Sequence, residues 1–106
     1  MKQIAVMTGH NRLDAINFMQ LLADKLKNRG VKGVRMNYRF LSITTQFADI
    51  QIFPYDAEHK LPKADKRFGF QCKTKPVYFK DYSDEIVDLV LVFESESREK
   101  LRKARV

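Results

Sequence analysis

The residues of this chain whose types could do chemistry are above all its arginines and lysines. Guanidinium and ammonium groups neutralise the phosphates of a nucleic acid, and an exposed aromatic side chain among them can stack on a base. Arg35 and Arg39 flank Tyr38 in the sequence. A second basic pair, Lys66–Arg67, directly precedes Phe68. Together with the basic C-terminal residues they predict one phosphate-binding set: Arg35, Arg39, Lys66, Arg67, Arg98, Lys100, Arg102, Lys103 and Arg105.

The net charge of +7 permits a nucleic acid, an acidic protein surface or an anionic ligand as partner. Residues 60–80 hold seven bases against one acid, whereas residues 81–96 hold six acids and no base. This alternation predicts separate basic and acidic faces, or two segments that pair with each other. An alternative is that the basic side chains are simply solvated, with Tyr38 and Phe68 in the core.

A candidate anion site lies at residues 8–12, between an apolar strand pattern and a helical pattern. Free N–H groups and the helix dipole favour an anion there, and a glycine lets a ligand approach the backbone. The residues of this site are Thr8, Gly9, His10, Asn11 and Arg12. The alternative is a tight strand–helix turn in which Asn11 caps the helix.

The order of strand, turn, long helix and a later apolar segment ending in acid, Leu89–Glu94, is similar to the core of P-loop NTPases of the helicase and terminase kind. Those proteins carry a turn that ends in Gly-Lys-Ser/Thr. Thr8–Arg12 lacks both the lysine that reaches the phosphates and the hydroxyl that holds magnesium. The resemblance therefore implies a degenerate phosphate- or nucleotide-binding domain without NTP hydrolysis.

Catalytic and metal-binding patterns are weak. His10 and His59 are far apart in the sequence, and Cys72 is the single cysteine, with no basic partner identified for it. Asp49 followed by Glu58 and Lys60 superficially resembles the acid and Glu-x-Lys pattern of metal-dependent nucleases of the restriction type, but Glu58 and Lys60 fall in a predicted loop. We therefore expect no metal and no cofactor, and we favour a non-catalytic protein over an enzyme.

The fold that must position these residues is predicted to be a single α/β domain of 106 residues. We expect a mixed sheet with central strands near 2–7 and 86–93, the second chosen because its apolar run suits a strand buried on both faces. A long helix near 12–29 covers one face, and a short C-terminal helix lies near 98–105. A strictly alternating segment, 34–40, predicts a half-exposed strand that continues to residue 44. The near alternative is an α+β fold.

No apolar run approaches the roughly 20 residues that span a bilayer, and the N-terminus does not resemble a secretory signal. We expect a cytoplasmic protein with no membrane partner. The leading interpretation is a small accessory protein that binds nucleic acid or a nucleoprotein assembly mainly through phosphates. Its size and charge suit an accessory factor of a phage or mobile element. The alternatives are the degenerate P-loop-like domain and a protein-interaction module or homo-oligomer that uses the acidic segment 81–96.

Overall fold

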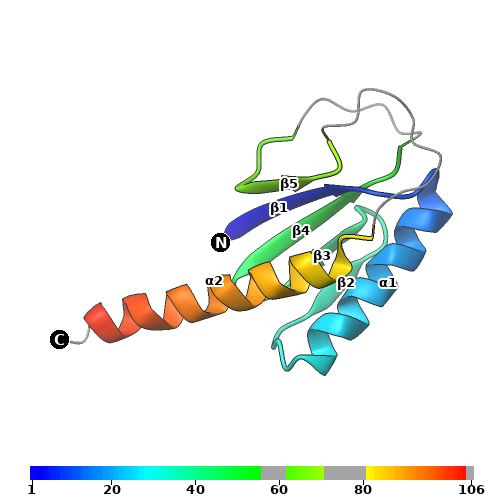
Figure 1. Ribbon diagram of the computed structural model, residues 1–106. Helices are drawn as coiled ribbons and strands as arrows, with labels where there is room; N and C mark the ends of the chain where they lie inside the picture. Colours follow the sequence, from blue (N-terminus) through cyan, green and yellow to red (C-terminus); the bar gives the residue numbers. More distant parts are fainter. Residues whose placement is uncertain (56–61, 71–80, 105–106) are drawn as a thin grey trace.

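The computed structural model describes residues 1–55, 62–70 and 81–104, with side chains as far as Glu99. Its elements are β1 (Lys2–Met7), α1 (Arg12–Asn28), β2 (Arg35–Asn37), β3 (Ser42–Thr44), β4 (Ala48–Phe53), β5 (Lys66–Phe68) and α2 (Ser83–Ala104). The five strands form one mixed sheet in the order β2-β3-β4-β1-β5 (Figure 1). β1 is parallel to both of its neighbours, whereas β3 is antiparallel to β2 and β4. The mixed α/β fold and its inner strand at residues 2–7 are confirmed.

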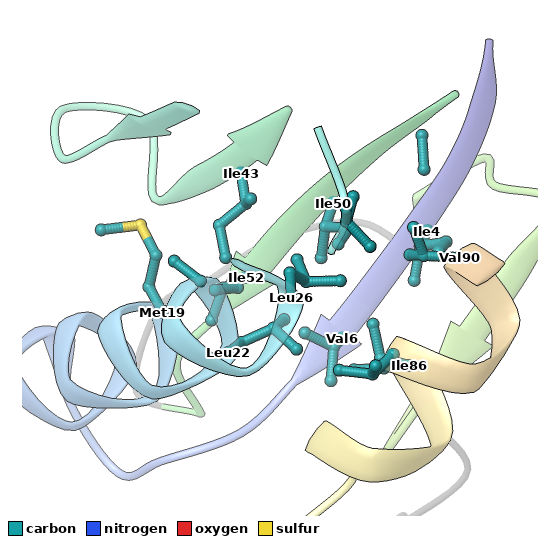
Figure 2. Packing of buried hydrophobic residues seen from close by; sticks show 14 of the residues in the cluster. Ile4, Val6, Met19, Leu22, Leu26, Ile43, Ile50, Ile52, Ile86 and Val90 are labelled. Atoms are coloured by element: carbon teal, nitrogen blue, oxygen red, sulfur yellow. The ribbon is translucent and has the colours of Figure 1, made fainter. Parts of the chain in front are cut away.

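Both helices pack on the same face of this sheet. The strand register pairs Ile4 with Ile50 and Val6 with Ile52, so these four apolar side chains point to one face. Figure 2 shows that face meeting side chains of α1 and α2 in a single buried cluster. The helices contribute Ala15, Met19, Leu22, Ala23, Leu26, Ile86, Val87 and Val90. The opposite face of β1 and β4 carries the polar residues Gln3, Asp49 and Gln51 together with Ala5, Met7 and Phe53, and neither helix packs on it.

The helix predicted over residues 12–29 is confirmed as α1. The Asp14 N–H donates to the Asn11 side-chain oxygen at 3.0 Å, which is the N-cap hydrogen bond expected from the sequence. At the other end Gly30 has a φ of +82° and follows the last turn, a backbone conformation that favours glycine. These local signals determine both ends of α1.

The central strand predicted near 86–93 is wrong, because these residues form part of α2. Ile86, Val87 and Val90 are buried, a spacing that puts them on one face of a helix, whereas Val92 is 49 % exposed. A continuous apolar run fits a buried strand and a buried helix equally well by periodicity. The predicted short C-terminal helix is confirmed as the end of this longer helix, whose last turns extend past the sheet (Figure 1).

The strand predicted to run from 34 to 44 is also wrong, because the chain reverses after Asn37. The Asn37 side-chain oxygen accepts the N–H groups of Arg39 at 3.0 Å and Phe40 at 3.2 Å. Leu41 then adopts a φ of +50°, is buried, and its carbonyl accepts the Ile52 N–H at 2.8 Å. The result is a β2–β3 hairpin in which Leu41 enters the core while Tyr38, Arg39 and Phe40 are exposed.

Candidate nucleic-acid interface

The predicted phosphate-binding residues lie in three separate places. Arg35 belongs to β2 and Arg39 to the hairpin turn, at one edge of the sheet. Lys66 and Arg67 belong to β5, at the opposite edge. Of the C-terminal residues, the last turns of α2 hold Arg98, Lys100, Arg102 and Lys103, and Arg105 lies outside the described residues. The structure therefore does not join the set into one surface.

Three predicted cations away from the hairpin, Lys66, Arg67 and Arg98, contact other groups of the chain. An Arg67 guanidinium nitrogen donates to the Pro62 carbonyl at 3.0 Å, and the Lys66 ammonium lies 5.8 Å from the ring centroid of Phe68. On α2, Arg98 pairs with Glu94 one turn before it, at 2.7 Å. These contacts do not prevent phosphate binding, but each of them competes with it.

The segment of the sequence that contains the β2–β3 hairpin is rich in basic residues and has no acidic ones. Residues 25–48 contain six bases and no acid. Two of the six are paired across the helix layer, Lys25 with Asp84 at 3.0 Å and Arg29 with Asp88 at 3.7 Å. Two acids of the segment 81–96, which was predicted to meet a basic partner, are thus paired with bases of the same chain.

Three of the remaining cations are exposed along the hairpin, and Arg12 joins them from the start of α1. The Arg12 guanidinium donates to the Tyr38 carbonyl at 2.6 Å and so lies at the hairpin turn rather than in the predicted anion loop. We call the four exposed cations Arg12, Lys32, Arg35 and Arg39 the hairpin basic surface. Reasoning from the sequence missed Lys32 and the role of Arg12, although the acid-free stretch of 25–48 was a usable signal.

Two aromatic side chains lie within the hairpin basic surface. Tyr38 is 45 % exposed and Phe40 is 68 % exposed. The Tyr38 hydroxyl accepts from the Gln20 amide at 3.3 Å and donates to the Met36 sulfur at 3.8 Å, which anchors its ring against α1. The guanidinium carbon of Arg39 lies 5.5 Å from the Phe40 ring centroid. The core location considered for Tyr38 is therefore not observed.

The loop of residues 8–12 is a closed strand–helix turn. Thr8 is buried and its N–H donates to the Phe53 carbonyl at 3.0 Å, while the Gly9 carbonyl accepts the Tyr55 N–H at 2.9 Å. The His10 N–H donates to the Asp14 carboxylate at 2.9 Å. A carboxylate thus stands at the helix N-terminus that an anion would approach, and its negative charge disfavours phosphate there.

Two carboxyl groups outside the hairpin have shifted pKa values. Hydrogen bonds from the Ser83 hydroxyl and backbone N–H lower the pKa of Asp81 below its usual value. Burial raises the pKa of Asp49, which lies on the sheet face opposite the helices. Asp49 lies in the same row of the sheet as Arg35, with Thr44 between them, whereas Asp81 precedes α2.

Other kinds of site find little support in the parts of the chain that the structure describes. There, no group of three or more His, Cys, Asp or Glu side chains could hold a metal ion. No helix of residues 1–55, 62–70 and 81–104 is long and apolar enough to cross a membrane. His59 and Cys72 lie outside the described residues.

A cleft of about 660 Å³ lies between the middle of α2 and the start of β1. It is lined by Met1, Lys2, Gln46, Phe47, Asp65, Phe93, Glu96 and Ser97, and it contains no residue of either predicted site. Its two acids and one lysine give it no clear preference for an anion. The hairpin basic surface is therefore the best-developed candidate site, and no protein-family model, curated protein or solved structure matches the chain.

Proposed function

We propose that this protein binds nucleic acid through the hairpin basic surface, by contacts between its cations and phosphates. The observation that carries the proposal is that Lys32, Arg35 and Arg39 are exposed within residues 25–48, a stretch of sequence without an acid, and that the Arg12 guanidinium reaches the hairpin turn. Each cation that meets a phosphate releases a condensed counterion, and this release drives binding without reading sequence. Such binding suits a cytoplasmic accessory protein with no catalytic role.

The position of these cations supports the proposal further. The Arg35 side chain is exposed and makes no hydrogen bond or ion pair with another described residue. The Arg39 guanidinium lies near the ring of Phe40 and makes no hydrogen bond or ion pair within the described residues, so its side-chain N–H groups are available to an oxygen acceptor. By contrast, Lys25 and Arg29 are paired with carboxylates of α2. Among the residues that the structure describes, Arg35 and Arg39 thus offer guanidinium groups to a phosphate along the hairpin.

The test is the salt dependence of binding to a labelled oligonucleotide, measured by fluorescence anisotropy. Four phosphate contacts with a single strand predict about a 50-fold loss of affinity between about 50 mM and about 200 mM salt. The variant Arg35→Ala/Arg39→Ala should bind more weakly. Its slope of log affinity against log salt should fall by about 0.7 for each arginine removed.

The matched control is Lys66→Ala/Arg67→Ala, which removes the same charge from the opposite edge of the sheet. It should retain most of the affinity and a nearly unchanged slope. Equal losses in the two variants would show that binding follows net charge and not the hairpin. Absence of binding at low salt would end the proposal altogether.

A further inference from the structure

We infer that the turn of the β2–β3 hairpin is a base-stacking site, and that its ligand is single-stranded nucleic acid rather than duplex. This inference rests on the proposed function and specifies its ligand. The juxtaposition that carries it is an exposed Phe40 ring beside the Arg39 guanidinium, with Tyr38 on the same turn and the Arg12 guanidinium bonded to the Tyr38 carbonyl.

The turn holds the Phe40 ring outward by a fixed backbone. The Asn37 side-chain oxygen accepts two consecutive N–H groups of the turn, from Arg39 and Phe40. Leu41 fills the core beneath, and its carbonyl is bonded to the Ile52 N–H. The exposed ring is therefore positioned before binding, so a ligand that contacts it does not have to order the loop first.

The exposed apolar surface at this turn is flat, aromatic and surrounded by positive charge. An aliphatic patch would favour an apolar protein partner, but a phenyl ring 68 % exposed among arginines suits a planar base whose phosphates lie on either side. Tyr38, whose hydroxyl is bonded to Gln20 of α1, is 45 % exposed and offers a second aromatic ring. Charge and ring chemistry thus complement the same polymer.

The choice of a single strand follows from where bases are accessible. In a duplex each base face is covered by its neighbours in the stack, and only base edges reach the grooves. A ring on a hairpin turn can stack on a base only where that base is already unstacked. The arginines alone would bind either form, whereas Phe40 adds affinity only for the single strand.

The experiment compares Phe40→Ala with the wild-type protein on an oligothymidine of about twelve nucleotides and on a duplex of equal length, by fluorescence anisotropy at low salt. The variant should lose about fivefold or more in affinity for the single strand. Its salt slope should not change, because no charge is removed. Duplex affinity should stay within about twofold, and Phe40→Trp should restore or increase binding to the single strand.

The control for lost apolar surface is Val92→Ala on α2, whose side chain is exposed away from the hairpin. It should leave both affinities unchanged, and thermal melts should show that Phe40→Ala stays folded, since the ring is mainly outside the core.

If Phe40→Ala binds the single strand normally while Arg35→Ala/Arg39→Ala does not, the stacking site is refuted and the proposed function stands. Equal losses of affinity for the single strand and for the duplex would refute the preference for a single strand. Tighter binding of an acidic peptide than of the oligothymidine would refute nucleic acid as the ligand of this turn. Failure of the wild-type protein to bind either nucleic acid would instead refute the proposed function.

Discussion

The carboxylate of Asp14 accepts a hydrogen bond from the His10 backbone N–H at 2.9 Å, across the turn that joins β1 to α1. The Asp14 N–H in turn donates to the side chain of Asn11 at 3.0 Å. The two bonds form a reciprocal cap, displaced by one residue from the usual capping box. These bonds satisfy backbone N–H groups at the start of α1 and place a carboxylate beside them.

We expect Asp14→Ala to lower the free energy of unfolding by about 1 kcal/mol, since it removes the acceptor of the His10 N–H and a favourable charge at the helix N-terminus. The measurement is denaturant unfolding followed by circular dichroism. Asp24→Ala, which removes an exposed carboxylate from the middle of α1, should change stability by less than about 0.5 kcal/mol. Equal effects of the two substitutions would contradict the capping role.

The helical state of residues 86–93 predicts different effects for two nearby valines. Val90 is fully buried, whereas Val92 is 49 % exposed. Val90→Ala should cost about 1.5–3 kcal/mol of stability, and Val92→Ala less than about 0.5 kcal/mol. In a strand the two side chains would lie on the same face and the two costs would be alike. Urea unfolding of both variants decides between the two structures.

The Asp81 carboxylate should make stability fall at acid pH. Hydrogen bonds from Ser83 lower its folded-state pKa below the usual value near 3.8, so its contribution is present above that value and is lost as pH falls through the folded pKa. Asp81→Asn should therefore be less stable than the wild-type protein at pH 7, and the gap should narrow below about pH 3.8. Thermal melts across this pH range measure the gap. A gap that is constant with pH would show that Asp81 acts by geometry and not by charge.

Asp49 should behave in the opposite way. Burial raises its folded-state pKa, so the ionised side chain opposes folding at neutral pH and stability gains from this group as pH falls. We expect Asp49→Asn to raise the melting temperature at pH 7 and to lose this advantage below about pH 3.8, where both folded and unfolded states are protonated. The comparison variant is Asp24→Asn, an equal charge change on an exposed side chain. A similar rise in both variants would assign the effect to net charge.

Lys25 of α1 contacts two residues at the start of α2 and so links the two helices. The Lys25 ammonium donates to the buried Ser83 hydroxyl at 2.6 Å and pairs with Asp84 at 3.0 Å. Lys25→Met should destabilise the protein by about 1–2 kcal/mol, because the buried hydroxyl loses a charged donor. Lys27→Met, on an exposed position of the same helix, is the control and should change stability by less than about 0.5 kcal/mol in chemical denaturation.

The sequence by itself determined the elements whose signals are local. The strand at residues 2–7, the helix from Arg12, its Asn11 cap and its end before Gly30 all follow from residue types within a few positions of one another. Hydrogen bonds of caps and turns close over short sequence distances, so distant residues rarely overrule them. The sequence also contains the run of bases without acids in residues 25–48, but only the structure showed that this run includes a hairpin with an exposed turn.

The tertiary structure decided the elements whose sequence fits two states. The run Ile86–Phe93 is apolar enough for either a strand or a helix, and the choice depends on what covers it: Ile86 and Val90 pack with α1 and β1, and two ion pairs tie the same helix to α1. The alternation over 34–40 likewise predicts one strand. In the structure, the Asn37 side chain stabilises a turn instead, and Leu41 occupies the core. That reversal exposes Tyr38 and Phe40 beside the arginines. Which side chains are buried depends on contacts across the whole fold, so the exposed residues of the candidate site could be identified only from the tertiary structure.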